Sequence, residues 1–342
     1  MHSPRRPRPW DLWWTQSKVQ PTSTPVLFIV GPTAVGKTGL AVALARRLNG
    51  EIVNADSRQV YRYMDIGTAK PSPEELAQAP HHLLDIVDPG INFDLASFLS
   101  LARGSIQDIR SRVRLPVVAG GSGQYVWALI EGWQVPKVPP DPAFRREKQQ
   151  EADLHGPMPL YRQLQEADPG RAAQLDPRNL RRVIRALEVC RSPQRAASDL
   201  QGRTQPMENV LVIGLTIDRE ELYQRIDDRV DRMMAAGLLE EVRNLDAMGY
   251  RMGQGPLASP GYRELGQHLA GEITLDEAVQ RTKYQTHHLA RRQHTWFKPD
   301  DGRIQWLDAS RPDLEACAAH LAAELLSGRY DTIGAPCQEP GR

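Results

Sequence analysis

The 342-residue sequence predicts an α/β fold: a parallel sheet with flanking helices, plus a helical insertion domain. Three observations predict it. Apolar runs of strand length alternate with helical periodicity between residues 26 and 133, and glycine-rich turns follow two of those runs. Four prolines in residues 134–142 then separate this region from a helical one that lacks strand patterns. Because strands that alternate with helices form βαβ units, the sheet should be parallel.

The first half of the predicted core shows four strand patterns with helix patterns between them. The predicted strands are residues 26–30, 51–54, 82–87 and 115–119, and the predicted helices are residues 39–48 and 93–112. The first strand is entirely apolar, which is typical of a strand buried on both faces. The second strand ends at Ala55-Asp56-Ser57, and the strand over 115–119 ends in Gly120-Gly121-Ser122-Gly123.

The rest of the chain supplies the insertion and the second half of the core. Residues 210–215 return to a buried-strand pattern, and Asp218 with Glu221 predicts a capping box at the start of a long helix. Leu222, Ile226, Val230 and Met233 should form the apolar face of that helix. We predict that the remainder is mostly helical. The expected division is a core of residues 25–133 and 206–326, an insertion at 134–205, and disordered tails at 1–24 and 327–342.

A complete phosphate-binding loop follows the first strand. Its residues are Gly31-Pro32-Thr33-Ala34-Val35-Gly36-Lys37-Thr38, which match the P-loop signature between a strand and a helix. Backbone N–H groups of Gly31, Thr33, Ala34, Val35, Gly36 and Thr38 can surround phosphate oxygens at a helix N-terminus. Lys37 supplies a positive charge, and the Thr38 hydroxyl can bind Mg²⁺. The loop predicts a P-loop NTPase-like core that binds nucleotides. Its ligand should be a diphosphate or triphosphate such as ATP.

The strand ends do not resemble those of a motor protein or GTPase. Those proteins carry an acid at the end of an apolar strand to hold Mg²⁺, whereas residues 115–119 run into glycines. We predict no strand that supplies this acid, which disfavours ATP hydrolysis. The Gly120–Gly123 turn either borders the ligand crevice at the carboxyl end of its strand or only begins the next helix.

Charge is distributed unevenly along the chain. The net charge is +1, but residues 171–203 carry +5 and residues 281–298 carry another +5, which leaves −9 elsewhere. This separation is typical of a surface that binds a polyanion, although helix faces with acidic partners from elsewhere would give the same count. No apolar run approaches the ~18 residues of a membrane span. Cys190, Cys317 and Cys337 lie far apart, which excludes a disulfide framework. We expect a monomeric, cytoplasmic protein with no membrane partner.

Asp56 lies at the carboxyl end of the second strand, where ligands bind in open α/β sheets. Its carboxylate could bind Mg²⁺, cap the next helix or act as a general base, and position alone leaves these roles open.

The surrounding residues extend to a family signature. Asp56-Ser57-Arg58-Gln59-Val60-Tyr61-Arg62 and the run from Met64 to Pro71 resemble the signature of tRNA dimethylallyltransferases, also called tRNA isopentenyltransferases. Further matching blocks follow in the same order: Gly120 to Tyr125, Asp176 to Asn179, Arg181 to Val189, Gly261 to Glu264, and Arg292 to Phe297. The resemblance covers residues 25–325, and the blocks together are far more specific than the P-loop alone.

The resemblance implies transfer of a five-carbon group from dimethylallyl diphosphate to N6 of adenine-37, beside the anticodon of tRNAs that read codons beginning with U. It implies Asp56 as the general base, and Mg²⁺ and the P-loop as the diphosphate site. Arg229 matches an arginine near the diphosphate, or else is an exposed helix residue. Ser122 replaces the usual threonine of its turn and keeps a catalytic hydroxyl. Ser259-Pro260 depart from the apolar residue usual before Gly261, which affects any tRNA contact from that loop.

The partner that the resemblance implies is the tRNA anticodon stem-loop, with adenine-37 extruded from its stack at a cost of a few kcal/mol. The basic and aromatic residues of the second charged segment fit such a partner, although Trp296 and Phe297 could equally be core residues. The residues expected to contact tRNA are Asp56, Ser57, Arg58, Gln59, Ser122, Arg145, Arg181, Arg182, Arg185, Arg291, Arg292, Gln293 and Trp296. Three alternatives stay open: a free-nucleotide isopentenyltransferase, a P-loop small-molecule kinase and a non-catalytic nucleic-acid-binding module.

Overall fold

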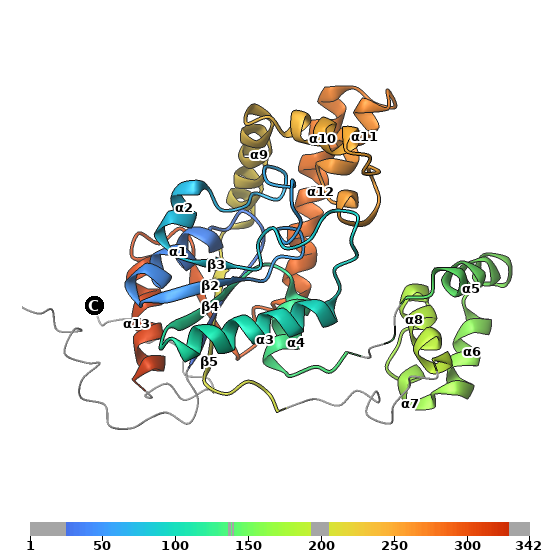
Figure 1. Ribbon diagram of the computed structural model, residues 1–342, viewed down its shortest axis with the longest axis horizontal. Helices are drawn as coiled ribbons and strands as arrows, with labels where there is room; N and C mark the ends of the chain where they lie inside the picture. Colours follow the sequence, from blue (N-terminus) through green and yellow to red (C-terminus); the bar gives the residue numbers. More distant parts are fainter. Residues whose placement is uncertain (1–24, 136–137, 139, 193–204, 328–342) are drawn as a thin grey trace, which may run out of the picture. The chain divides into compact units, whose positions relative to one another are not determined.

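The computed structural model describes residues 25–135, 138, 140–192 and 205–327. The predicted tails lie outside these residues, apart from Ser327, which ends the last helix. The described residues group into two compact units (Figure 1). The core unit contains residues 25–94, 98–130 and 207–327, and the insertion unit contains residues 95–97 and the described part of 131–206. No helix in the described ranges is both long and apolar enough to cross a bilayer.

The core unit is built on one six-stranded sheet in the order β3-β2-β4-β1-β5-β6. Its strands are β1 (Val26–Val30), β2 (Gly50–Asn54), β3 (His81–His82), β4 (Leu115–Ala119), β5 (Val210–Thr216) and β6 (Ile304–Asp308). Every neighbouring pair is parallel. Leu27 of β1 faces Val117 of β4 on one side and Leu211 of β5 on the other, and all of β1 is buried. The predicted fold class is confirmed.

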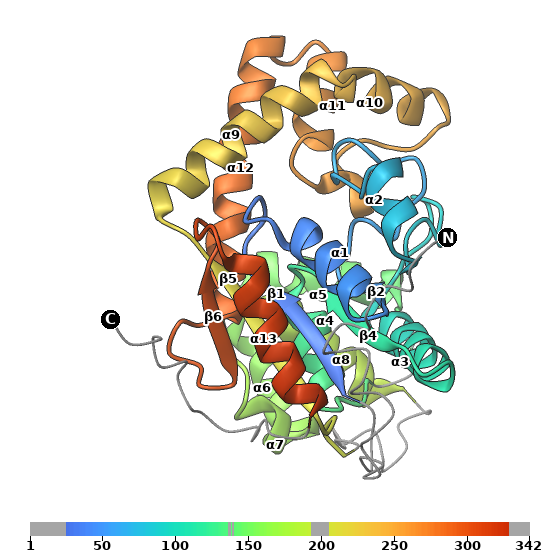
Figure 2. The same ribbon diagram turned by 90° about the vertical axis from the view of Figure 1, so that its left-hand side faces the viewer.

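Helices cover both faces of the sheet and extend beyond its edge (Figures 1 and 2). They are α1 (Lys37–Arg47), α2 (Pro73–Gln78), α3 (Leu95–Ser111), α4 (Gly123–Ile130), α9 (Arg219–Ala235), α10 (Leu238–Ala247), α11 (Tyr262–Leu269), α12 (Leu275–Trp296) and α13 (Leu314–Leu326), with a 3₁₀ turn at Gly255–Ala258. Leu44 of α1 and Leu321 of α13 pack in one apolar cluster with Leu27 and Ile29 of β1. This packing fixes α1, and with it the loop that precedes it, over the centre of the sheet.

Two strand predictions differ from the structure. The strand predicted over 82–87 is only His81–His82, because Leu83 and Asp85 adopt left-handed backbone conformations that end it. A strand at β6 was not predicted. It is a half-buried edge strand, so it lacks the continuous apolar run of a central strand. It ends in an acid, Asp308, which was not identified from the sequence because this strand was not predicted. Asp308 is exposed, lies two strands from β1 and accepts hydrogen bonds from Ser310.

The long helix after β5 begins as the sequence predicts. Asp218 caps α9 by accepting hydrogen bonds from the N–H groups of Glu220 and Glu221. The predicted capping box is incomplete, because within the described residues the Glu221 side chain accepts no hydrogen bond from the Asp218 N–H. Leu222, Ile226 and Val230 are buried as expected, and Met233 is half-buried against a second apolar cluster.

The insertion unit is helical throughout its described residues. Its helices are α5 (Pro142–His155), α6 (Met158–Ala167), α7 (Pro169–Ala172) and α8 (Leu180–Arg191). Leu160 and Leu164 of α6 pack against Val183 and Leu187 of α8 in a separate apolar core. The insertion unit therefore has an apolar core of its own.

A buried carboxylate ties together two helices of the insertion unit. Glu188 of α8, 4% exposed, receives a two-pronged hydrogen bond from Arg145 at 2.9 and 2.8 Å, and another from the Asp141 N–H at 2.6 Å. Arg185 also donates to Glu188 and to the Val138 carbonyl. Burial raises the pKa of Glu188, but the hydrogen bonds from Arg145, Asp141 and Arg185 outweigh it and hold the pKa below its usual value.

Replacing Glu188 with glutamine should destabilise the insertion unit. Two arginines would lose their counter-ion, and because their side chains are 43% and 34% exposed we expect a cost of about 1–3 kcal/mol rather than that of a fully buried pair. Since the pKa of Glu188 is lowered by folding, its contribution is present above the unfolded pKa and lost as the pH falls through the folded pKa. Urea unfolding at neutral and acidic pH measures both effects.

Glu240→Gln is the matched control for Glu188→Gln, since Glu240 pairs with Arg243 on an exposed face of α10. We expect it to change the free energy of unfolding by less than about 0.5 kcal/mol. Equal effects of the two substitutions would contradict a structural role for Glu188.

Candidate active site

Three strands that lie side by side, β2, β4 and β1, end at the same edge of the sheet, and the loop after each carries candidate site residues. The P-loop follows β1, Ala55–Ser57 follow β2, and the Gly120–Gly123 turn follows β4. Gly31 begins the P-loop with φ 143°, and a Cβ there would lie 2.7 Å from the Leu215 carbonyl oxygen. Glycine is therefore required at this position by the close approach of β5.

Lys37 lies at the start of α1, directly after Gly36, whose φ of 103° turns the loop into the helix. Its ammonium group donates a 2.6 Å hydrogen bond to the Pro32 carbonyl. Burial lowers the pKa of Lys37 to about 8, with a raising influence from Asp56 and a further lowering from Arg229. The three charges are thus close enough to act on one another.

Arg229 is half-buried on α9, so the alternative of an exposed helix arginine is wrong. Burial lowers the pKa of its guanidinium, while the charge of Asp56 raises it. The site therefore holds two cations and one carboxylate, and the excess positive charge favours an anionic ligand.

Thr38 is the residue that the sequence predicts to hold Mg²⁺, through its hydroxyl. Its side chain lines a small pocket that also includes the side chains of Asn54, Gln59 and His81. Apolar residues from α1, β2 and β4 close the pocket.

Asp56 is held in a tight turn rather than at a helix cap. Its Oδ1 accepts a 2.8 Å hydrogen bond from the Arg58 N–H, and its own N–H donates to Oδ1 of Asn54 at 3.0 Å. Asn54, 5% exposed, also donates to the Leu83 carbonyl. No helix begins directly after Asp56, so helix capping is excluded, and its second carboxylate oxygen has no protein donor among the described residues.

Ser122 joins the loops after β4 and β2. Its hydroxyl oxygen accepts a 3.0 Å hydrogen bond from the Ser57 N–H, and its own N–H donates to the Ala55 carbonyl. A side chain at Gly120 would collide with the backbone of Ala55, which shows how closely the two loops approach. The turn leads directly into α4, which begins at Gly123.

Gln293 of α12, 8% exposed, connects the P-loop to the same turn. Its Oε1 accepts a 2.7 Å hydrogen bond from the Thr33 N–H, and its Nε2 donates to the Gly121 carbonyl at 3.2 Å. The sequence predicts a tRNA contact here, but the structure engages both amide groups inside the protein. Gln59 is likewise engaged, since its Nε2 donates to the carbonyls of Thr68 and Ala69.

The aromatic residues at the end of α12 divide between core and surface. Phe297 is 1% exposed and belongs to the core, next to Trp127. Trp296 is half-buried against Gly123, and its carbonyl accepts a 2.9 Å hydrogen bond from Trp127. These contacts fix the end of α12 beside the start of α4.

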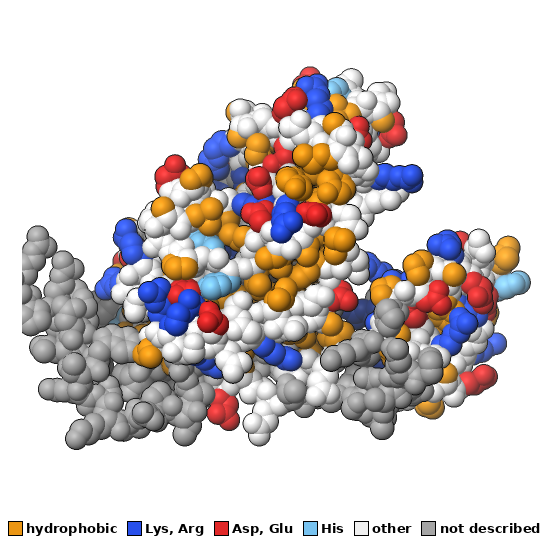
Figure 3. Space-filling view, viewed as in Figure 1, with side chains coloured by type: hydrophobic (Ala, Val, Ile, Leu, Met, Phe, Trp, Pro, Cys, Tyr) orange, Lys and Arg blue, Asp and Glu red, His pale blue; other side chains and the backbone are white. Residues whose placement is uncertain are grey.

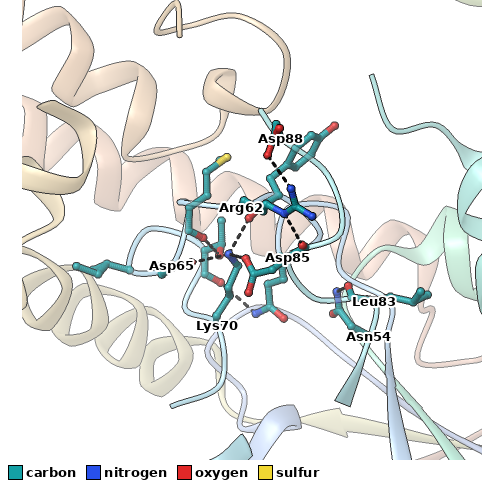
Figure 4. A network of polar contacts seen from close by, with 12 residues as sticks. Asn54, Arg62, Asp65, Lys70, Leu83, Asp85 and Asp88 are labelled. Carbon is teal, nitrogen blue, oxygen red and sulfur yellow. Dashed lines mark hydrogen bonds and ion pairs between the residues drawn. The ribbon is translucent and has the colours of Figure 1, made fainter. Parts of the chain in front are cut away.

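A polar network holds the loops that follow β2 and β3 (Figure 4). Lys70, with 7% of its side chain exposed, donates to the Tyr61 carbonyl at 2.7 Å and pairs with Asp65 and Asp85. Arg62 donates to the Asp85 carbonyl and pairs with Asp88. Since Asn54 joins this network to the Asp56 turn, the loops form one frame behind the carboxylate.

A second carboxylate closes the frame from α10. Glu241 accepts hydrogen bonds from three successive N–H groups, those of Asp65, Ile66 and Gly67, and from the Tyr262 hydroxyl at 2.6 Å. Burial and the Glu241 charge raise the pKa of Tyr262. The ring of Tyr262 packs on Gly67, where a Cβ would lie 2.6 Å from it. The sequence gives no signal for Glu241, because the loop whose N–H groups it binds is about 175 residues away in the chain.

Ser259-Pro260, which depart from the family's usual sequence, follow directly after a regular 3₁₀ turn. Ser259 is buried and its hydroxyl donates to the Pro256 carbonyl, which closes the 3₁₀ turn. Gly261, with φ 92°, then begins α11 and donates its N–H to Glu264.

The two basic segments contain both paired and unpaired arginines. In the first, Arg178 pairs with Asp176 and Arg185 with Glu188, and in the second, Arg281 pairs with Glu277. By contrast, four exposed arginines have no acidic partner within the described ranges: Arg181, Arg182, Arg291 and Arg292. Of the predicted contacts, Arg145 and Arg185 are thus held in the Glu188 network, although each keeps part of its side chain exposed.

The unpaired arginines create positive potential in both units. Burial lowers the pKa of His288, and the charges of Arg291 and Arg292 lower it further. Burial likewise lowers the pKa of Arg171 in the insertion unit, and Arg182 adds to the effect. On the face of the molecule in Figure 3 the basic side chains are scattered among acidic ones, so that face lacks a continuous basic patch.

The chain matches models of two related families. The family described as IPP transferase matches residues 59–300, and the one described as isopentenyl transferase matches residues 24–88. The second match covers the start of the core unit, from β1 and the P-loop to the loop after β3.

Curated relatives are similar over most of their length. A tRNA dimethylallyltransferase of Chloroflexus aurantiacus is 50% identical over 288 residues, 84% of this chain and 96% of the relative. One of a Roseiflexus species is 48% identical over 302 residues, 88% of this chain and 99% of the relative.

Solved structures agree in fold. The tRNA isopentenylpyrophosphate transferase of Bacillus halodurans has a TM-score of 0.67 and 38% identity, and the match covers 90% of this chain and 98% of that one. A eukaryotic dimethylallyltransferase, described as acting on tRNA, has a TM-score of 0.74 and 29% identity, with 93% and 82% covered. Together with the P-loop, Asp56 and the Ser122 turn at one sheet edge, these matches show that the chain belongs to the tRNA dimethylallyltransferase family of prenyltransferases.

Proposed function

We propose that this protein transfers a dimethylallyl group from dimethylallyl diphosphate to N6 of adenine-37 in tRNAs that read codons beginning with U. The observation that carries the proposal is that the P-loop, the Asp56 turn and the Ser122 turn follow β1, β2 and β4 at one sheet edge, where the charge of Asp56 acts on Lys37 and Arg229. Cations and P-loop N–H groups suit a leaving diphosphate, and a carboxylate suits an amine that must lose a proton.

The leaving group departs from the P-loop side. The bond between the allylic carbon and the diphosphate oxygen breaks, and the electron pair stays with the diphosphate. Charge therefore develops on that oxygen while the allyl group gains cationic character. Lys37 and Arg229 stabilise the developing negative charge, the kind of electrostatic effect that dominates many enzymes.

The acceptor amine is deprotonated on the Asp56 side. N6 forms the new bond to the allylic carbon, and its proton passes to the free carboxylate oxygen of Asp56 and then to solvent. The Arg58 N–H holds the other oxygen and so fixes the direction of the carboxylate. The Ser122 hydroxyl accepts from Ser57 and keeps its own proton available to donate to the adenine or to phosphate.

Mg²⁺ is the metal that this site would hold, through the Thr38 hydroxyl and oxygens of the substrate diphosphate. Thr38 lies next to Lys37 in the P-loop, and its hydroxyl is an oxygen ligand of the kind that Mg²⁺ prefers. When bound, the ion would add positive charge where the leaving group becomes more negative.

The tRNA contacts that we propose lie in each unit separately. They are the unpaired arginines of α8 in the insertion unit and, in the core unit, the unpaired arginines of α12 with Trp296 as the aromatic residue. Extended RNA recognition of this kind combines phosphate contacts with stacking on splayed bases. Ser57 and Arg58 directly follow Asp56, and their side chains are proposed to contact the extruded base.

The experiment that tests this function compares two acceptors. Purified protein is given dimethylallyl diphosphate and Mg²⁺ with either AMP or an anticodon stem-loop that carries adenine-37. We expect prenylation of the stem-loop and little of AMP, because AMP cannot engage the arginines of α8 and α12. A preference for AMP would instead indicate a free-nucleotide isopentenyltransferase.

Arg182→Ala should weaken binding to the stem-loop and reduce its salt dependence. Arg182 is exposed without an acidic partner among the described residues, so a phosphate contact would release about one counterion. The slope of log K against log salt should therefore become shallower by roughly one unit. Arg162→Ala, an exposed arginine of α6 outside the basic segments, is the control. An unchanged slope for Arg182→Ala would remove Arg182 from the interface.

A further inference from the structure

Gln293 is the one buried glutamine that joins two loops of the active site within the described residues. It bonds the P-loop through the Thr33 N–H and the β4 turn through the Gly121 carbonyl, at 2.7 and 3.2 Å. Gly121 has no room for a side chain because the Gln293 amide occupies that space. Its neighbours on the same turn of α12, Arg291 and Arg292, face solvent.

The hydrogen bonds of Gln293 continue to the acceptor side of the site. Gly121 is followed by Ser122, whose hydroxyl accepts from the Ser57 N–H, and Ser57 adjoins Asp56. The chain of contacts therefore runs from the loop that holds the diphosphate to the carboxylate that takes the proton. Since the side chain of Gln293 uses its acceptor on one loop and its donor on the other, it sets the spacing of the two loops.

We propose that Gln293 is a positioning residue that holds the diphosphate loop and the acceptor loop in register for the transfer. The proposal rests on the proposed function, because only a transfer between the two loops makes their spacing matter. Reacting atoms must lie within about 3–3.5 Å, and a displacement of about 1 Å can cost about 10²-fold in rate. Loss of Gln293 should therefore act on the chemical step more than on the binding of either substrate.

Gln293→Met tests the proposal, since methionine keeps the length and bulk of the side chain and loses both hydrogen bonds. We expect kcat to fall by about 10–100-fold, while the Kd values for inorganic diphosphate and for the unmodified stem-loop each change by less than about threefold. Gln280→Met, at an exposed position on the same helix, is the matched control and should leave all three quantities unchanged.

Gln293→Glu is the second variant and covers the case in which methionine prevents folding. It keeps an acceptor for the Thr33 N–H but places a carboxylate oxygen against the Gly121 carbonyl, so kcat should again fall. A folded variant with wild-type kcat would overturn the proposal, and so would a fall in kcat matched by an equal loss of diphosphate affinity. Failure of the wild-type chain to prenylate the stem-loop would instead contradict the proposed function itself.

Discussion

Lys37→Met is expected to lower kcat/KM for dimethylallyl diphosphate by about 10²–10³-fold, the usual cost of removing one preorganised group from a developing negative charge. Methionine retains an unbranched apolar side chain and removes the charge together with the hydrogen bond to the Pro32 carbonyl. The affinity for the stem-loop should stay within about threefold of wild type, because Lys37 lies in the P-loop and not on the proposed tRNA surface. Steady-state prenyl transfer and a separate binding titration measure the two effects.

The Lys37 charge should also make substrate binding depend on pH. Burial lowers its pKa to about 8, so Lys37 is protonated below that pH and neutral above it. Binding of dimethylallyl diphosphate should weaken as the pH rises, by about tenfold between pH 7 and 9. Lys37→Met should lose this component, whereas Lys148→Met, which breaks an ion pair with Glu151 in the insertion unit, should keep it. The same pH dependence in wild type and Lys37→Met would contradict this role.

Asp56→Asn is expected to lower kcat by about 10²–10⁴-fold, the usual contribution of a general base. Asparagine keeps an oxygen to accept from the Arg58 N–H, so the turn should be preserved while the base is lost. Binding of the stem-loop should change little. Rapid-quench measurement of a single turnover reports the chemical step directly.

Asp88→Asn is the control for the Asp56 substitution, because Asp88 lies in the adjoining loop and pairs with Arg62 at the surface. It should retain turnover within about threefold of wild type. If Asp56→Asn keeps full turnover, the base is another group. If it loses tRNA binding and turnover equally, Asp56 contributes to binding rather than to proton transfer.

The position of the P-loop in the fold could be predicted because its determinants are local in sequence. The P-loop signature and the buried run of β1 occupy adjacent residues, and parallel strands bring their carboxyl ends to one edge. The order of β2, β4 and β1 then brings Asp56 and Ser122 beside Lys37. No further information was needed to bring these residues together.

The frame behind the site could not be predicted because its partners are distant in the chain. Gln293 and Thr33 are 260 residues apart, and Glu241 binds the loop at Asp65–Gly67 across about 175. A polar side chain in a helix gives no sign in sequence of whether it faces solvent or a buried N–H group. The same holds for Arg145, whose carboxylate partner lies 43 residues away.

Basic residue counts predict a binding surface, but they do not show which basic side chains lack an acidic partner. The structure divides these residues into two groups. Arg178, Arg185 and Arg281 have acidic partners, whereas Arg182 and Arg292 have none among the described residues.

The edge strand β6 could not be predicted from the sequence either. It is half-buried, so it lacks the apolar run by which a central strand is identified.

The most direct measurement of the central claim is the location of the prenyl group on the reaction product. An anticodon stem-loop from a tRNA that reads a codon beginning with U is incubated with the protein, dimethylallyl diphosphate and Mg²⁺, then digested and sequenced by mass spectrometry. The account predicts N6-dimethylallyladenosine at position 37 and no modification when that adenine is replaced by guanine. Prenylation at another nucleotide, or of the guanine-substituted stem-loop, would contradict it.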